Sequence, residues 1–250
     1  MTRGEGACLV CEKPLIYLKR AKEMECSFCH KKYKSYAACE DGHFVCDDCH
    51  EEKGIRLILE TCAGSTAQNP IALMQDLMEN PYLYMHGPEH HVLVGAALLT
   101  AYRNCGGAID LAASLSEMRE RGSSYPGGAC GLWGCCGAAV SAGMFFSIVT
   151  QATPLTGKSW GLSNQITAQA LGAIAKLGGP RCCKRNSFTA VREAVLFTEH
   201  HLDVYKRQGV HRLSWHDGFD GESVPPCGPG SAWNHEDCVQ RDRNGSWQAF

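Results

Sequence analysis

The chain has 250 residues, 16 cysteines and a formal net charge of −2 at neutral pH. This length suits one sizeable core with a small additional module. A nearly neutral chain has no overall field that favours nucleic acid or anionic membranes, so we expect neither as a partner. The polar start Met1–Gly6 is followed by no apolar segment, so no signal peptide is expected.

The cysteine content therefore indicates thiolates that hold metal in a reducing cytoplasm, rather than the disulfides of a secreted protein. The longest apolar stretch, Gly137–Thr150, is too short to span a bilayer and is rich in glycine and alanine. We expect it to form a buried, closely packed helix.

Residues 1–50 carry cysteine pairs at the spacing of metal-binding turns. A two-residue gap lets both thiolates face one ion, and two such turns complete a tetrahedral site. We predict a zinc-ribbon module that binds one or two zinc ions. The predicted ligands are Cys8, Cys11, Cys26, Cys29, Cys39, His43, Cys46 and Cys49.

Two groupings of these eight ligands are open. The favoured grouping is sequential, with the first four residues around one ion and the last four around another. A cross-braced grouping, RING-like in order, uses the same residues. His30 and His50 adjoin ligand cysteines and are expected outside the coordination shells, and the lysines between the turns are expected to be solvated surface.

Residues 51–202 are expected to form an all-α domain, because apolar residues recur at helical spacing between capping residues and glycine or proline stops. Ser187 is the expected cap of the last helix. The predicted helices are Ile55–Cys62, Ile71–Met78, Glu89–Tyr102, a helix from Asp110 to Gly122, Ala138–Thr150, Gln165–Leu177 and Phe188–His201.

Residues 203–250 are expected to be an irregular, disordered or chimeric tail. The segment from Asp203 to Gln208 resembles translated sequencing-adapter sequence, and residues 209–250 have neither helical nor strand periodicity. Cys227, His235 and Cys238 in this tail are therefore weak metal candidates.

A second cysteine group opens two of the predicted helices, where helix N-termini favour thiolates and anions. It could hold a cofactor such as a [4Fe-4S] cluster, form a redox dithiol pair, or pack as small apolar residues. Adjacent cysteines rarely bind one metal together, so we expect one member of each adjacent pair to pack. The group comprises Cys130, Cys135, Cys136, Cys182 and Cys183.

His86, Glu89 and His90 lie at the start of the helix that follows Pro88 and are the candidate catalytic residues. A carboxylate and an imidazole at one helix mouth suit proton abstraction or metal binding. A capping or surface role is the alternative. His90 and His91 project about 100° apart, so at most one is expected to face inward.

Residues 8–202 resemble an uncharacterised family of anaerobic bacteria and archaea, classed as a domain of unknown function. The matching stretches include CLVCEKPLIY, YMHGPEHHVLVGAALLTAY, GGACGLWGCCGAAVSAGMFFSI and GGPRCCKRNSF. Members are sometimes labelled methyltransferase-related, but this chain has no glycine-rich strand–loop–helix for S-adenosylmethionine, so that activity is not expected here.

A weaker resemblance links the chain to iron–sulfur L-serine dehydratases and cysteine desulfidases. It rests on GPEHH at 87–91, GCCGAAVSAG at 134–143, and Cys182 three residues before Arg185, in that order. The serines of that family's first segment are replaced here by Glu89 and His90, which changes the expected substrate.

These features predict a cytoplasmic metalloprotein. The resemblance implies a lyase in which an iron–sulfur cluster acts with a nearby base on an unknown small molecule. The alternative is a non-enzymatic, zinc-binding accessory protein that docks on a protein partner, for example a methyltransferase.

Overall fold

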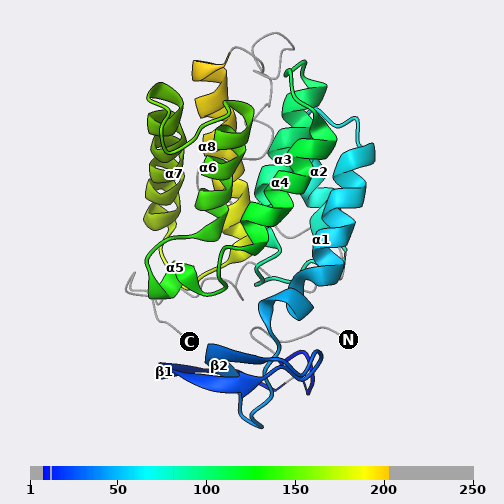
Figure 1. Ribbon diagram of the computed structural model, residues 1–250, viewed down its shortest axis with the longest axis vertical. Coiled ribbons are helices and arrows are strands. Elements are labelled where there is room, and N and C mark those ends of the chain that lie inside the picture. Colours follow the sequence, from blue (N-terminus) through cyan, green and yellow to red (C-terminus); the bar gives the residue numbers. More distant parts are fainter. Residues whose placement is uncertain (1–7, 12, 81, 203–250) are drawn as a thin grey trace, which may run out of the picture.

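The computed structural model describes residues 8–11, 13–80 and 82–202, and it shows a helical bundle above a small N-terminal hairpin (Figure 1). This arrangement confirms the predicted fold class, a mainly helical chain with a cysteine-bearing N-terminal module. The tail 203–250, including the three weak metal candidates in it, lies outside the described residues.

The N-terminal module, residues 8–49, is built on two antiparallel strands. β1 (Leu15–Glu25) pairs with β2 (Lys32–Cys39), with a bulge between Tyr17 and Lys22. Most side chains of both strands are exposed or only half-buried. A lone two-stranded hairpin is marginally stable in water, so the module needs a further source of stability, which its metal ligands can supply.

Helices joined by loops make up the rest of the described chain, and the seven longer helices alternate in direction between the two ends of the bundle (Figure 1). The helices are α1 (Asp47–Gly64), α2 (Pro70–Met78), α3 (His90–Asn104), α4 (Leu111–Ser123), α5 (Ala129–Leu132), α6 (Gly137–Val149), α7 (Lys158–Leu177) and α8 (Cys183–His201).

Three helices begin at least one full turn earlier than predicted. α1 begins at Asp47 because the last metal-binding turn continues into it, and α7 adds two largely exposed turns before Gln165. The expected cap at Ser187 is wrong: Cys182 is the N-cap of α8, and its sulfur accepts a hydrogen bond from Arg185 N at 3.4 Å. The single-turn α5 was not predicted.

α3 is the central helix, and α1, α2, α4, α6 and α8 all pack against it. Its residues from 90 to 102 are buried on every side. Phe145 and Phe146 bring α6 into the same core as the large side chains of α3. The apolar stretch predicted as a buried helix is α6, and none of the described helices is long and apolar enough to cross a membrane.

Candidate metal centres and the bundle end

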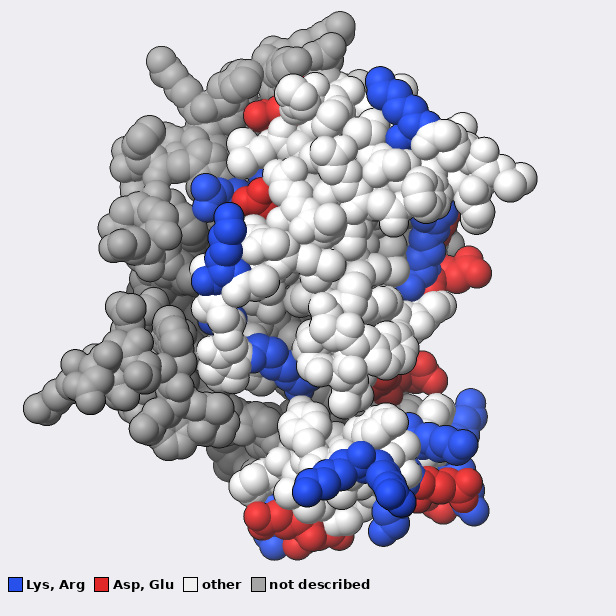
Figure 2. Space-filling model, turned by 90° about the vertical axis from the view of Figure 1, so that its left-hand side faces the viewer, with Lys and Arg blue, Asp and Glu red and all other residues white. Residues whose placement is uncertain are grey.

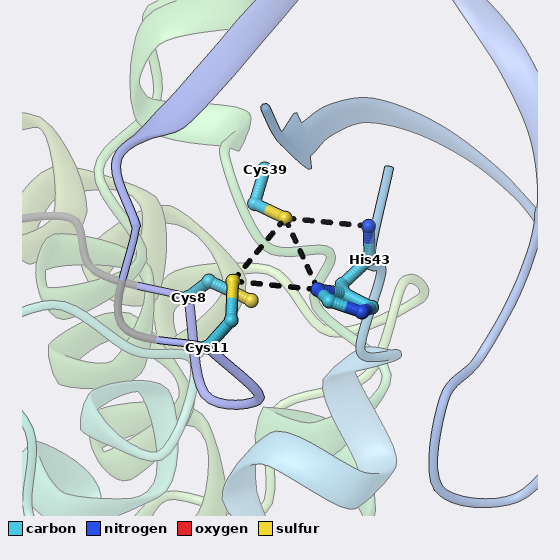
Figure 3. Close-up of side chains that lie close together, drawn as sticks. All are labelled: Cys8, Cys11, Cys39 and His43. Carbon is cyan, nitrogen blue, oxygen red and sulfur yellow. Dashed lines mark hydrogen bonds between the residues drawn. The ribbon is translucent and has the colours of Figure 1, made fainter. Parts of the chain in front are cut away.

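The eight predicted zinc ligands form two compact clusters. Site 1 lies beside the strand ends, where the first turn meets the segment after β2 (Figure 3). Site 2 joins the turn between the strands to the start of α1. Site 1 comprises Cys8, Cys11, Cys39 and His43, and site 2 comprises Cys26, Cys29, Cys46 and Cys49; within each, the candidate ligand atoms lie within 4.8 Å of one another.

This grouping is the cross-braced one, so the favoured sequential grouping is wrong. The first cysteine turn shares a site with the third ligand pair, and the second turn shares a site with the fourth. The strand pairing causes this alternation, because β2 returns the chain from the second turn to the first. Gly42, at φ +81°, makes the tight turn that brings His43 back to Cys39.

The spacing of the ligand atoms fits zinc. Tetrahedral ligands at a Zn–S distance of about 2.3 Å place two sulfurs about 3.8 Å apart. Cys11 Sγ lies 3.8 Å from Cys39 Sγ, and Cys29 Sγ lies 3.7 Å from Cys46 Sγ. A disulfide requires about 2.05 Å, and every described cysteine is unbridged.

Site 1 uses the imidazole Nδ1 as its nitrogen donor. His43 Nδ1 lies 3.4 Å from both Cys11 Sγ and Cys39 Sγ (Figure 3). The sequence indicated His43 as a ligand but could not distinguish its two ring nitrogens. The three-sulfur, one-nitrogen set of site 1 and the four-sulfur set of site 2 are both usual for structural zinc.

Backbone N–H groups favour the thiolate forms that metal binding needs. His43 N donates to Cys39 Sγ at 3.3 Å, and Cys46 N donates to Cys26 Sγ at 3.3 Å. Burial raises the pKa of both thiols, but backbone hydrogen bonds outweigh it and lower the pKa of Cys26 to about 6 and of Cys39 to about 7. Each site thus contains one thiol that ionises more readily than an ordinary cysteine, although the pKa values of Cys11, Cys46 and Cys49 are raised.

The lysines of the module do not form a purely basic face. Lys32 forms an ion pair with Glu23 at 3.3 Å, and Lys34 lies opposite Glu23 across the hairpin. Basic and acidic side chains lie side by side on the module in Figure 2. The hairpin therefore carries mixed charge, in keeping with a solvated surface.

The module rests on one end of the bundle, and the second group of predicted site residues lies there. Tyr17 accepts a hydrogen bond from Arg181 Nη2 through its hydroxyl at 2.8 Å. Asp47 Oδ2 accepts a hydrogen bond from Gly127 N at 3.0 Å. These contacts bring β1 and the start of α1 against the connections that precede α6 and α8.

Cys130 and Cys183 lie near Arg181 at this end, and Cys136 lies near Cys183. The Arg181 guanidinium interacts with the Cys130 and Cys183 thiols. Burial raises the pKa of Cys183 to about 12, with smaller contributions from Cys130 and Cys136, while Arg181 opposes the rise. In the part of the chain that is described, no three of these sulfurs come within the 4.8 Å expected of ligands to a single ion.

The other two cysteines of the predicted group have structural contacts. Cys182 is buried, caps α8 and places its sulfur 3.8 Å from Met85 Sδ. Cys135 lies beside Tyr125, whose hydroxyl donates to the Cys135 carbonyl oxygen at 2.9 Å. Burial and the Cys135 thiol both raise the pKa of Tyr125. Cys182 therefore packs against Met85 and caps α8, whereas its neighbour Cys183 lies near the thiols of Cys130 and Cys136.

His90 and His91 are both buried, so the prediction that at most one would face inward is wrong. The reason is that helices surround α3 on all sides. His90 Nε2 lies 2.9 Å from the Tyr84 carbonyl oxygen, and its Nδ1 lies 3.1 Å from Ser187 Oγ. With both nitrogens engaged, His90 holds α3 to α8 and offers no free nitrogen for catalysis.

Four buried side-chain nitrogen or oxygen atoms have no hydrogen-bond partner among the described residues, and all of them lie at the module end of the bundle. They are His50 Nδ1, Glu51 Oε2, His86 Nδ1 and Glu89 Oε2. His50 Nδ1 lies 3.7 Å from Glu89 Oε2, too far for a direct hydrogen bond. Buried polar atoms normally have partners, so these atoms are free to bind water or a polar ligand.

The charge states of this buried polar group differ. Burial, together with Arg181 and His90, lowers the pKa of His86 to about 4, which leaves a neutral imidazole. Burial raises the pKa of Glu51 to about 8. Burial also disfavours ionised Glu89, but the facing His50 and His90 lower the pKa of Glu89 below its usual value. Glu51 and His50 were not predicted as site residues, because only their packing against Glu89 identifies them.

The fold and the two ligand clusters together define a cysteine-rich protein with two candidate zinc sites joined to a helical bundle. The chain belongs to the family of unknown function DUF5714, whose model matches residues 58–212. The match begins inside α1, so the N-terminal module precedes it. No curated protein and no solved structure matches the chain.

Proposed function

We propose that this protein is a cytoplasmic metalloprotein that uses its two cysteine groups differently. Two zinc ions stabilise the N-terminal module, and the bundle end binds an iron–sulfur cluster that takes part in a lyase reaction on a small molecule. The main support is that Cys183 interacts with Cys130 and Cys136 from a separate connection, with Arg181 beside Cys130 and Cys183. The unbridged state of all described cysteines fits a reducing compartment.

A cluster can accommodate these three thiols, which do not meet the spacing of a single-ion site. The cysteines of an iron–sulfur cluster bind different iron atoms, so they stand farther apart than the ligands of one zinc ion. Arg181 and the N-termini of α6 and α8 supply positive charge beside the thiols. This charge stabilises thiolates and a negatively charged cluster.

When bound, such a cluster would supply an iron atom that polarises a hydroxyl or thiol group of a substrate. The buried polar group next to the thiols offers the residues for proton transfer. His86 is neutral with an unpartnered Nδ1 that can accept a proton, and Glu89 is a buried carboxylate with one unpartnered oxygen. His90 positions α3 and is not part of this step.

The test compares two neighbouring cysteines in the full chain, purified without oxygen. Replacing Cys183 with serine should remove a cluster ligand and lower iron and acid-labile sulfide at least about fivefold. The matched control is Cys182→Ser, because serine is a preferred N-cap residue and retains the role of Cys182 in α8. Zinc should stay near two ions per chain in both variants.

Iron, sulfide and the absorption band near roughly 400 nm would be measured in all three proteins. Unchanged iron in Cys183→Ser, or equal loss in both variants, would contradict the assignment of Cys183. A colourless wild-type protein with zinc alone would reject the cluster.

A second candidate function is that of a non-enzymatic accessory protein. Leu132 and Trp133, at the end of α5, are 54% and 67% exposed, beside the Cys130 connection. Exposed apolar residues of this size are typical of a contact with a protein partner. This second function, for example that of a methyltransferase partner, predicts that the protein binds zinc and no iron.

A further inference from the structure

The two adjacent histidines of α3 differ in their hydrogen bonds. His91 Nδ1 lies 3.1 Å from the Tyr125 carbonyl oxygen. A carbonyl only accepts, so Nδ1 carries the proton and Nε2 carries the lone pair. The Tyr125 ring packs edge-on against the imidazole, with ring centroids 5.2 Å apart. Tautomer and ring orientation are therefore both set by Tyr125.

His91 Nε2 has no hydrogen-bond partner among the described residues. The ring lies directly on the start of α6. A Cβ atom on Gly137 would lie 2.3 Å from Nε2 and 2.1 Å from Cδ2, so only glycine fits there. Gly137 follows Cys136, one of the thiols at the bundle end.

On the basis of the function proposed above, we infer that His91 binds the metal centre at the bundle end through Nε2. A ring nitrogen that donates to a backbone carbonyl, while the other nitrogen faces an open site, is the usual arrangement of a metal-binding histidine. Metal binding also requires a neutral ring. The single proton on Nδ1, donated to the Tyr125 carbonyl oxygen, leaves the ring neutral with its lone pair on Nε2.

The first experiment measures the availability of Nε2 directly. Full-length protein with zinc but no iron is treated with diethyl pyrocarbonate, which modifies neutral imidazole nitrogens, and the modified peptides are quantified by mass spectrometry. His91 should react and His90, whose two nitrogens are engaged, should not. After anaerobic loading with iron and sulfide, modification of His91 should fall at least about tenfold. His30 is exposed and serves as the control that stays reactive.

The second experiment detects the iron–nitrogen bond by pulsed EPR of the reduced, loaded protein. Wild type and His30→Gln should show a nitrogen coupling, and His91→Gln should lose it. Persistent modification of His91 in loaded protein, or an unchanged coupling in His91→Gln, would overturn the inference while leaving the cluster in place.

Absence of any cluster in wild type would instead reject the proposed function, and the role of His91 with it. The modification experiment uses the wild-type chain, so it decides the question even where His91→Gln fails to fold.

Discussion

At the scale of single residues, neighbours of the same type have different roles at the bundle end. Cys182 is buried and caps α8, whereas Cys183 faces Arg181 and the other thiols. His90 uses both ring nitrogens to hold α3 in place, whereas His91 keeps one nitrogen free. Chemical type alone does not separate such pairs; their hydrogen bonds do.

The cross-braced grouping predicts how paired ligand losses combine. Cys8→Ser with Cys39→Ser removes two ligands from site 1 and should leave one zinc ion per chain, at site 2. Cys8→Ser with Cys26→Ser damages both sites and should leave almost none. Native mass spectrometry of the two double variants measures the zinc content.

Each double variant serves as the control for the other, because both lose two thiolates. A sequential grouping predicts the opposite order, with one zinc retained when Cys8 and Cys26 are replaced and none when Cys8 and Cys39 are replaced. That result would refute the geometry of sites 1 and 2.

At the scale of elements, α1 links the metal sites to the bundle. Cys46 caps α1 without a side-chain hydrogen bond, and Cys49 lies in its first turn. Both are candidate ligands of site 2, so a zinc ion there would fix the start of the helix. His50 and Glu51 follow directly and face Glu89 of the bundle. Site 2 thus positions His50 and Glu51, which belong to the buried polar group at the bundle end.

Removal of zinc should therefore loosen the start of α1 while the bundle core persists. In hydrogen–deuterium exchange after chelation, amides around residues 47–51 should exchange at least about tenfold faster. Amides of α3 should change little, since its residues are buried by five other helices.

Two single variants separate the sites. Cys26→Ser disrupts site 2 and should reproduce the loss of protection, whereas Cys8→Ser disrupts site 1 and should affect α1 less. Unchanged protection at 47–51 in zinc-free protein would show that the bundle alone holds this turn.

At the scale of the whole molecule, the alternation of the seven longer helices collects the N-termini of α1, α3, α6 and α8 at the module end (Figure 1). Each N-terminus carries a partial positive charge. Arg181 adds a full charge, and neither it nor the buried Arg185 forms an ion pair with a described carboxylate. The bundle end is therefore suited to thiolates and other anions.

The buried histidines at this end should lower the free energy of unfolding in mild acid, whereas Glu51, whose pKa is raised to about 8, acts in the opposite direction. His86 and His91 have folded-state pKa values of about 4, below the usual 6.5. Below pH 6.5 the unfolded chain binds protons that the folded chain excludes, so stability is lost as pH falls from 6.5 toward 4. Each histidine should contribute about 1.4 kcal/mol per pH unit in this range.

Urea unfolding of zinc-loaded protein at pH 7 and pH 5.5 measures this effect. His91→Gln should lose about 1 kcal/mol less than wild type between the two pH values, and the exposed His30→Gln should match wild type. Equal losses in all three proteins would show that His91 is not buried as a neutral ring.

Much of this architecture is encoded in local patterns. The pair spacing of Cys8, Cys26 and Cys46 with their partners identified the metal-binding turns, because a turn and its ligands lie within a few residues. Apolar periodicity likewise identified the longer helices. Helix starts were less accurate, as at Ser187, because a buried hydrogen bond to His90 is not visible in sequence.

The sequence by itself determined the candidate metal ligands, the helical class and the small size of the N-terminal module, since each depends on residues close together in the chain. Only the tertiary structure decided which ligands share an ion, because the return of β2 sets the pairing. It also decided that both His90 and His91 are buried and that Cys183, not Cys182, joins Cys130 and Cys136. These features arise where helices distant in sequence end at the same side of the bundle. The spacing of neighbouring residues in the sequence does not reveal such contacts.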